Sequence, residues 1–243
     1  ICEPVGVFDV KYLGNIGRYI PVCDGNHLII NTIESIPWES DFDTVVLGHL
    51  KELSNISQKN YLKFFIEKCV IYKKNVYAFD DVSKEIKEQM NSAGLKLYTP
   101  VISKNNVPLG YEGRLRQIGK PILCIAGTSP KQGKFSLQLQ LKKILSKTVR
   151  VGLISTEPSG YLVGANAVFP MGYDSTVKLE KGNEYISTVN YVMGMIEDED
   201  VDLIITGLQS QTIPMKLCNQ RDMVIFNHYY LLGANPDAVI LMV

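Results

Sequence analysis

The sequence predicts an α/β protein with mainly parallel sheets and flanking helices. Short apolar runs rich in β-branched residues alternate with helical patterns along the whole chain, which is typical of this fold class. Hydrophobic residues make up 46% of the 243 residues, enough to bury one large or two modest cores. In such proteins the loops that follow the strands gather at one edge of the sheet, where functional residues are expected.

The first half of the chain contains four strand patterns and one clear helix. The helix is expected over residues 61–72, because its apolar residues recur at helical spacing and form one buried stripe. Strands are expected at residues 5–10, 44–49, 75–80 and 95–100, the last ended by Pro100. Residues 103–121 are rich in Asn, Gly and Pro and lack periodicity, so the domain boundary is placed there. We interpret residues 1–115 as a Rossmann-like α/β domain.

The second half, residues 116–243, repeats the strand–helix pattern more regularly. Strands are expected at residues 121–127, 150–155, 201–207 and 237–243, and helices at residues 133–146, 184–197 and 222–232. In the first helix Leu137, Leu141, Ile144 and Leu145 should be buried, with Gln138 facing water. The chain lacks an initial methionine and stops inside an apolar strand pattern, so we expect the full-length protein to continue beyond Val243.

Charge and cysteine usage narrow the function class. Lys plus Arg and Asp plus Glu number 25 each, so no overall field draws the chain to nucleic acid or to an anionic membrane. The apolar runs are too short to span a bilayer, and no signal peptide opens the sequence. Five scattered cysteines are typical of free thiols in a reducing compartment. We therefore expect a cytoplasmic protein.

A strand, a small polar loop and a Gly-Lys pair that opens a helix form the pattern of a P-loop. The backbone N–H groups of such a loop and the helix dipole bind phosphate, and the lysine reaches the terminal phosphates. The residues expected to contact the nucleotide are Gly127, Thr128, Ser129, Pro130, Lys131, Gln132, Gly133, Lys134, Phe135 and Ser136. Thr128 stands where the first glycine of the motif belongs, and Phe135 stands where the Mg²⁺-binding hydroxyl belongs. A structural turn with a solvated Lys134 is the alternative.

The loop "GTSPKQGKFS" resembles that of the dethiobiotin synthetase group. More closely, it resembles a bacterial P-loop family that includes D-glutamate N-acetyltransferase, in which a non-hydroxyl residue also follows Gly-Lys and a Thr or Ser comes next. The segments "STEPSGYLVGANAVFPMGYDS", "DLIITGLQSQTIP" and "LLGANPDAVILMV" extend the likeness over residues 121–243. The amino-acid sequences of these segments are most similar to those of a family of peptide maturation system proteins. The resemblance implies a P-loop NTPase-like domain and a role beside enzymes that modify precursor peptides.

Residues after the neighbouring strands complete the expected site. P-loop enzymes usually share the metal with an acid at the end of a neighbouring strand. The strand at residues 201–207 has no such acid, and Gln209 follows it. Glu157 is the candidate metal ligand or base, with Ser136 as second metal ligand and Lys134 as the catalytic cation. Substrate contacts are expected from Thr156, Ser159, Asp174 and Gln209.

Purely structural explanations stay open for the acidic residues. Glu157 could be an exposed loop carboxylate, and Asp174 with Ser175 could be a turn or a cap. Asp80 and Asp81 could bind a metal or a ribose, although a capping Asp before the next helix explains them more simply.

The leading hypothesis is a nucleotide-binding protein that takes ATP or GTP with Mg²⁺ and supports modification of a peptide or small carboxylate. Its partners would be a precursor peptide and the modifying enzyme, and a homo-oligomer stays open. The second hypothesis is an N-acetyltransferase that holds the phosphates of acetyl-CoA in the same loop, as the D-glutamate relative implies. The third is a non-catalytic peptide-binding module with a vestigial loop.

Overall fold

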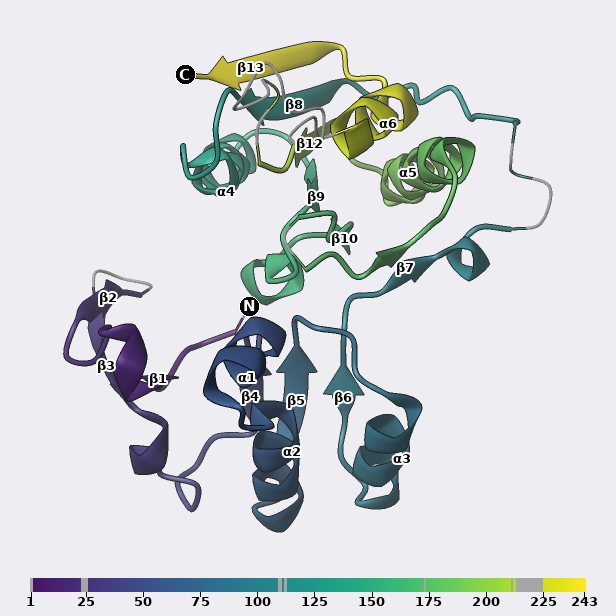
Figure 1. Cartoon of the computed structure of the whole chain (residues 1–243). Helices are drawn as coiled ribbons and strands as arrows, with labels where there is room; N and C mark the ends of the chain where they lie inside the picture. The colour runs from purple at the N-terminus through teal and green to yellow at the C-terminus, as the bar shows by residue number, and fades with distance from the viewer. Residues whose placement is uncertain are drawn as a thin grey trace, which may run out of the picture. The chain divides into compact units, whose positions relative to one another are not determined.

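The computed structural model describes residues 2–22, 26–108, 111, 113–172, 174–210, 212 and 225–243. The chain divides into two compact units, the first formed by Ile1–Ala78 and Val82–Thr99 and the second by Phe79–Asp81 and Pro100–Val243. The predicted fold class is confirmed, because the sheets are mainly parallel and helices flank them (Figure 1). The segment from Pro100 packs with the second unit, so this division lies earlier in the chain than the boundary expected near residue 115.

The first unit contains two small sheets. One has the order β1-β3-β2, in which β1 (Val7–Asp9) runs parallel and β2 (Tyr19–Pro21) antiparallel to β3 (His27–Thr32). The other is parallel and has the order β4-β5-β6, formed by β4 (Thr44–Leu47), β5 (Asn75–Ala78) and β6 (Leu97–Tyr98). The helices of this unit are α1 (Lys51–Ser57), α2 (Tyr61–Ile71) and α3 (Lys84–Ser92).

Helix α2 has the apolar stripe that the sequence predicts. Phe65, Ile66 and Cys69 are buried in the core of the first unit, against Val76 of β5. The helix begins after Asn60, whose side-chain oxygen accepts a hydrogen bond from the Lys63 N–H at 2.9 Å. An N-cap of this kind satisfies a backbone donor that the first helical turn leaves open.

The second unit is built on a five-stranded parallel sheet with the order β10-β9-β12-β8-β13. Its strands are β8 (Ile122–Gly127), β9 (Val151–Ser155), β10 (Ala167–Val168), β12 (Leu203–Gly207) and β13 (Ala238–Met242). Its helices are α4 (Lys134–Leu145), α5 (Gly182–Asp198) and α6 (Ile225–Ala234). A short parallel pair, β7 (Ile102–Ser103) with β11 (Val177–Lys178), lies outside this sheet. Asp222 of the predicted last helix lies outside the described residues.

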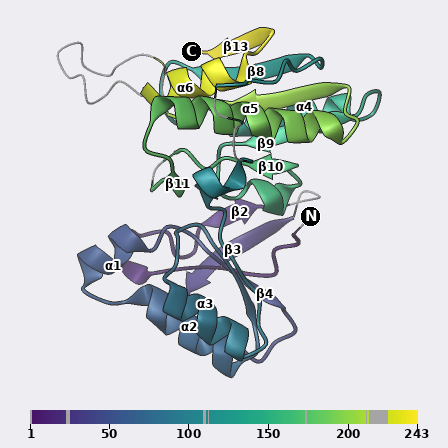
Figure 2. The same ribbon diagram turned by 90° about the vertical axis from the view of Figure 1, so that its right-hand side faces the viewer.

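The strands β8, β9 and β12 are covered on both faces, whereas the edge strand β13 is exposed along most of its length. Figures 1 and 2 show α4 on one face and α5 with α6 on the other. Neighbouring residues of one strand point to opposite faces. Thus Leu153 of β9 joins the cluster under α4, whereas Ile154 joins the cluster under α5 and α6. Strands with both faces buried read as continuous apolar runs, which explains why the sequence shows them clearly.

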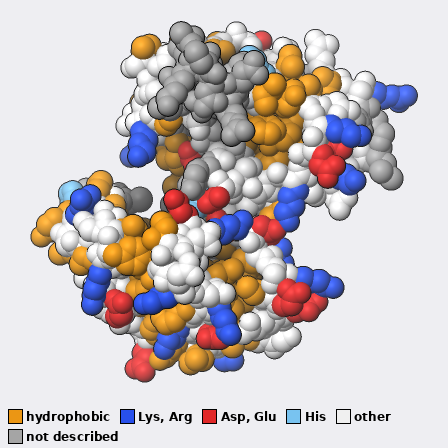
Figure 3. Space-filling model, in the orientation of Figure 1, with side chains coloured by type: hydrophobic (Ala, Val, Ile, Leu, Met, Phe, Trp, Pro, Cys, Tyr) orange, Lys and Arg blue, Asp and Glu red, His pale blue; other side chains and the backbone are white. Residues whose placement is uncertain are grey.

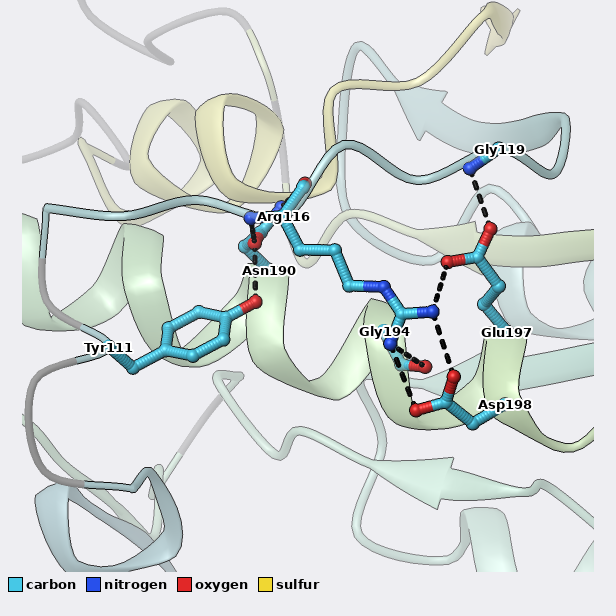
Figure 4. A network of polar contacts seen from close by, with 7 residues as sticks. All are labelled: Tyr111, Arg116, Gly119, Asn190, Gly194, Glu197 and Asp198. Carbon is cyan, nitrogen blue, oxygen red and sulfur yellow. Dashed lines mark hydrogen bonds and ion pairs between the residues drawn. The ribbon is translucent and has the colours of Figure 1, made fainter.

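A network of polar contacts attaches the segment before β8 to α5 (Figure 4). The buried Asn190 side chain accepts hydrogen bonds from the Tyr111 hydroxyl and the Arg116 N–H, both at 2.7 Å, and donates to the Arg116 carbonyl at 3.0 Å. The Arg116 guanidinium contacts both carboxylate oxygens of Asp198, and it lies 2.8 Å from a carboxylate oxygen of Glu197. This network fixes where the chain enters β8.

Two expectations about individual residues were wrong. Gln138 is 1% exposed, although the pattern placed it toward water, and Ile144 is 60% exposed, although it was expected in the buried stripe. The inward face of α4 runs from Lys134 through Gln138 to the partly buried Leu141 and Leu145. Gln138 fits there because it packs against the backbone of Gly207, where β12 offers no side chain.

The face drawn in Figure 3 carries charged side chains of both signs. Acidic and basic side chains are interspersed over the face drawn in Figure 3, in keeping with the formal net charge of zero. None of the helices that the structure describes is both long and apolar enough to cross a lipid bilayer. Cys69 and Cys124 are buried free thiols, and burial raises the pKa of each to about 12.

Candidate functional site

The β8–α4 loop (residues 128–133) lies at a switch point of the five-stranded sheet. From β8 the chain passes through α4 to β9 on one side of β8, whereas β13 pairs with the other side. Ligands of open parallel sheets bind beyond the carboxyl ends of the strands at such a point. The topology therefore places this loop where a ligand site is expected.

The backbone of the loop is tightly turned and anchored at its beginning. Gly133 has φ 85° and Lys131 has φ 62°, both in the left-handed region. The Thr128 N–H donates to the Met242 carbonyl at 3.0 Å, which connects the loop to the end of β13. The Gly127 carbonyl accepts hydrogen bonds from the N–H and the hydroxyl of Thr212, at 2.9 and 3.0 Å. The loop is thus held between its two neighbours at the sheet edge.

Lys134, the first residue of α4, points into the loop. Its side chain is buried at 8% relative exposure, and its Nζ donates to the carbonyl oxygens of Ser129 at 2.9 Å and Ser210 at 2.6 Å. Burial lowers the Lys134 pKa, and the negative charge of Glu157 partly opposes this shift. The expectation of a solvated lysine on an ordinary turn does not describe this residue.

Gln132 fills the interior of the same loop. Its Oε1 accepts a hydrogen bond from the Ser129 N–H at 3.0 Å, and its Nε2 donates to the Thr128 hydroxyl at 2.9 Å. Phe135 is half-buried and Ser136 is exposed. Lys131 is also exposed, so Lys134 is the lysine that this loop directs inward.

The segment after β9 presents Glu157 toward the loop. The Ser155 hydroxyl accepts from the Glu157 N–H and donates to its carbonyl, both at 3.0 Å, which forms a compact turn. Gly160 packs directly against Ser155 of this turn, because a Cβ on Gly160 would lie 2.3 Å from the Cβ of Ser155. This turn holds Glu157 close enough to Lys134 for its charge to act on the lysine.

Thr156 and Gln209, two of the expected substrate contacts, are brought together by the fold. The Gln209 Nε2 donates to the Thr156 hydroxyl at 3.1 Å, and both residues are buried. The Gln209 carbonyl in turn accepts from the Nδ2 of Asn227 on α6 at 2.9 Å. The side chain of Gln209 also packs against Gly172, because a Cβ on that glycine would lie 2.9 Å from its amide. The predicted residues thus form a buried polar layer beyond β9 and β12.

The remaining expected residues lie in turns. Ser159 is half-buried at the start of the 3₁₀ turn Gly160–Val163. Asp174 is half-buried with φ 49°, and the next residue, Ser175, donates its hydroxyl to the Pro170 carbonyl at 2.9 Å. The backbone at Asp174 is that of a local turn, but its Oδ2 is buried and has no hydrogen-bond partner among the described residues.

Of the two aspartates before α3, Asp80 is buried, and one of its carboxylate oxygens lies within 4.8 Å of one of Asp174. Asp81 forms an ion pair with Lys178. Ser83 is the N-cap of α3, since its hydroxyl accepts from the Ile86 N–H at 3.5 Å. The expectation that an aspartate caps this helix was therefore wrong, because the serine that follows is placed one residue before the helix.

Sequence reasoning missed three buried polar residues behind the site. The Tyr230 hydroxyl lies 2.5 Å from the Thr206 hydroxyl, which donates to the Ile154 carbonyl at 3.2 Å. Gln138 is buried beside Gly207, and its Oε1 has no hydrogen-bond partner among the described residues. Each of these lies in an apolar run or on a helix face, so only its position in the fold distinguishes it.

In chemical terms the site is suited to an anion. The N-terminus of α4 carries partial positive charge and has no side-chain cap among the described residues, and Lys134 adds a full charge in a buried position. Glu157, whose charge acts on Lys134, is half-buried and forms no direct ion pair with this lysine. A ligand with phosphate oxygens would satisfy these donors.

The fold defines the class of the protein as an α/β protein with a parallel five-stranded sheet. None of the family models matches the sequence. The comparison with curated proteins gave no match either. Among solved structures, the fold is similar to the crystal structure of a DUF1611 family protein from Anabaena variabilis ATCC 29413, with a TM-score of 0.60 and 12% sequence identity. The match covers 99% of this chain and 66% of that chain, and at this identity it shows a shared fold.

Proposed function

We propose that the protein binds a phosphate-containing nucleotide, ATP or GTP with Mg²⁺, in the β8–α4 loop. The observation that carries this proposal is the buried Lys134 ammonium at the start of α4, whose two hydrogen-bond acceptors are backbone carbonyls. Burying a lysine for structure alone is costly, because charged groups are strongly solvated in water. A phosphate that replaces these carbonyls would form charge-assisted hydrogen bonds with the Lys134 ammonium.

The metal would be held largely by the phosphates, with Glu157 and Ser136 as the protein ligands. Both offer oxygen atoms, the ligand type that Mg²⁺ prefers. Glu157 fits this assignment because its charge already acts on Lys134. Ser136 fits less directly, since it lies on the exposed side of the first turn of α4. The sequence resemblance to peptide maturation proteins supports a precursor peptide or small carboxylate as the substrate.

A second candidate, the binding of acetyl-CoA for N-acetyl transfer, is favoured by one observation. The end of β12 carries the amide of Gln209 hydrogen-bonded to Thr156, where a metal-binding acid would be expected in a nucleotide hydrolase. Binding the phosphates of acetyl-CoA needs no metal ligand at this position. The same loop and the same Lys134 would then hold the CoA phosphates.

Calorimetric titration of the whole chain with ATP, GTP and acetyl-CoA, each with Mg²⁺, tests both candidates. Lys134→Ala should weaken binding about tenfold to a hundredfold, since hydrogen bonds to charged groups contribute roughly 1.5–3 kcal/mol. Lys143→Ala is the matched control, because Lys143 is an exposed lysine on the same helix. The ligand that binds wild type most tightly decides between the candidates.

Two results would contradict the proposal. Unchanged affinity in a folded Lys134→Ala variant would show that any binding occurs elsewhere. Absence of binding by folded wild type for all three ligands would leave the loop as a structural turn, and a non-catalytic peptide-binding module would become the better reading.

A further inference from the structure

The side chain of Gln132 occupies the position in the β8–α4 loop that a phosphate oxygen would take. In a phosphate-binding loop the backbone N–H groups point inward and donate to the anion. Here the Ser129 N–H donates to the Oε1 of Gln132 at 3.0 Å. The carboxamide oxygen is an acceptor, as a phosphate oxygen is, so it satisfies this donor in the same way.

The space inside the loop is correspondingly filled. A Cβ placed on Gly127, at the base of the loop, would lie 2.5 Å from the Gln132 Oε1 and 3.2 Å from the Lys134 Nζ. The carboxamide oxygen and the ammonium therefore both lie over the Gly127 backbone. A phosphate could reach this position only if Gln132 moved away.

The loop holds Gln132 in this inward position by several contacts. Its Nε2 donates to the Thr128 hydroxyl at 2.9 Å, so both ends of the amide are used. Lys131 and Gly133, the residues on either side of it, both have left-handed backbone conformations. These two turns fold the chain tightly around Gln132 and direct its side chain back across the loop.

We propose that Gln132 is a built-in competitor of the phosphate ligand, a side chain that closes the empty loop and must leave before phosphate enters. This inference rests on the proposed function and concerns the regulation of that same site. Binding is then an exchange in which the Ser129 N–H loses the Gln132 oxygen as its acceptor and donates to a phosphate oxygen in its place. The contacts that hold Gln132 inward are lost on binding, so they lower the affinity.

Removal of the Gln132 carboxamide should therefore tighten binding. Two hydrogen bonds of ordinary net strength separate the closed loop from the open one, so Gln132→Ala should bind phosphate about fivefold to a hundredfold more tightly. Gln132→Asn should behave similarly, because its shorter side chain does not reach the Ser129 N–H and the Thr128 hydroxyl together. If Gln132 were instead a ligand of the phosphate, both variants would bind more weakly than wild type.

The test is calorimetric titration of inorganic tripolyphosphate with Mg²⁺ into wild type, Gln132→Ala and Gln132→Asn. Tripolyphosphate carries no base, so the result does not depend on which nucleotide the protein prefers. Gln140→Ala is the matched control, since Gln140 is an exposed glutamine on α4. Thermal unfolding of each variant, with and without tripolyphosphate, shows whether the fold is retained and provides a second readout of affinity.

The outcomes separate this inference from the proposed function. Tighter binding in both Gln132 variants, with the control unchanged, supports the competitor. Equal or weaker binding in folded variants overturns it, while Lys134-dependent binding by wild type would leave the proposed function intact. If wild type and the Gln132 variants all fail to bind tripolyphosphate and the three ligands named above, the proposed function fails and the inference falls with it.

Discussion

At the scale of the residue, Lys134 is the group whose environment is most informative. Its burial disfavours the charged form, so its pKa in the ligand-free protein lies below the ordinary value of 10.5. Between the lowered pKa and 10.5, the unfolded chain binds the Lys134 proton more tightly than the folded chain does. The lysine therefore makes the folded state less stable at neutral pH and ceases to do so as pH rises through the lowered pKa toward 10.5.

A bound phosphate should raise the Lys134 pKa, whereas burial alone lowers it. Its negative charge stabilises the lysine ammonium, so the Lys134 pKa rises on binding and the complex takes up a proton at alkaline pH. We expect affinity for tripolyphosphate to be highest near neutral pH and to fall as pH rises through the lowered Lys134 pKa. Calorimetry in buffers of different ionisation enthalpy, from pH 7 upward, measures both the affinity and the proton uptake.

Lys134→Ala is the control for this pH dependence. Any residual binding by that variant should lose the alkaline decline, since the titrating group is gone. An identical decline in wild type and variant would assign the titration to another group and contradict the prediction.

At the scale of the element, the contact between α5 and α6 depends on a glycine. A Cβ on Gly233 would lie 2.5 Å from the Ile186 carbonyl oxygen and 2.7 Å from the Cβ of Val189. The first of these is a backbone atom, which cannot move aside as the end of a flexible side chain can. Close approach of the two helices at this point therefore requires glycine.

Gly233→Ala should destabilise the folded state by about 1–3 kcal/mol, the usual cost of overpacking a well-packed core. Chemical denaturation followed by circular dichroism measures this loss. Gly194→Ala on α5 is the comparison and should cost less, because the three atoms nearest a Cβ there all belong to the Arg116 side chain, the closest at 3.1 Å, and none is a backbone atom. A Gly233→Ala variant as stable as wild type would show that the helices separate without cost.

The elements that the sequence predicts well are those with a strong pattern. The central strands and α2, α4 and α5 were predicted because both-face burial and helical periodicity leave a clear apolar signal. Strands of two residues, such as β7 and β10, are too short to leave one. The face of α4 was misjudged at Gln138, because periodicity records hydrophobicity and not the space beside Gly207.

The candidate site follows the same rule. The strand, loop and lysine were visible in the sequence, and the structure places Lys134 inside the loop. That the Gln132 side chain turns inward and fills the loop could not be foreseen, because this depends on the left-handed backbone at Lys131 and Gly133. The pairing of Gln209 with Thr156 joins residues far apart in sequence, so it depends on the order of β9 and β12 in the sheet.

At the scale of the whole molecule, the second unit has a core of its own. The central strands of its sheet are covered on both faces by its own helices, and the segment from Pro100 contributes β7, which pairs with β11. The Thr176 hydroxyl donates to the Pro100 carbonyl, and Tyr111 and Arg116 bind Asn190. Of these residues, Pro100 and Tyr111 belong to the segment that the sequence assigned to the first domain.

A fragment of residues 100–243 should therefore fold by itself and unfold cooperatively. It loses the ion pair between Asp81 and Lys178, but surface pairs of this kind contribute only about 0–1 kcal/mol. A fragment of residues 116–243 is the matched control and should be less stable, because it lacks β7 and Tyr111. Urea unfolding followed by circular dichroism compares them, and equal stability or an unfolded longer fragment would contradict this division.

The pairing of β13 with β8 has a consequence for the order in which the protein matures on the ribosome. The Thr128 N–H is held by the Met242 carbonyl, so the beginning of the β8–α4 loop is anchored by a strand that is translated much later. Chains emerge from the N-terminus first, and domains fold as they are completed. During synthesis β8 therefore has an unpaired edge until β13 has been translated, and the loop can reach its final shape only after β13 has paired.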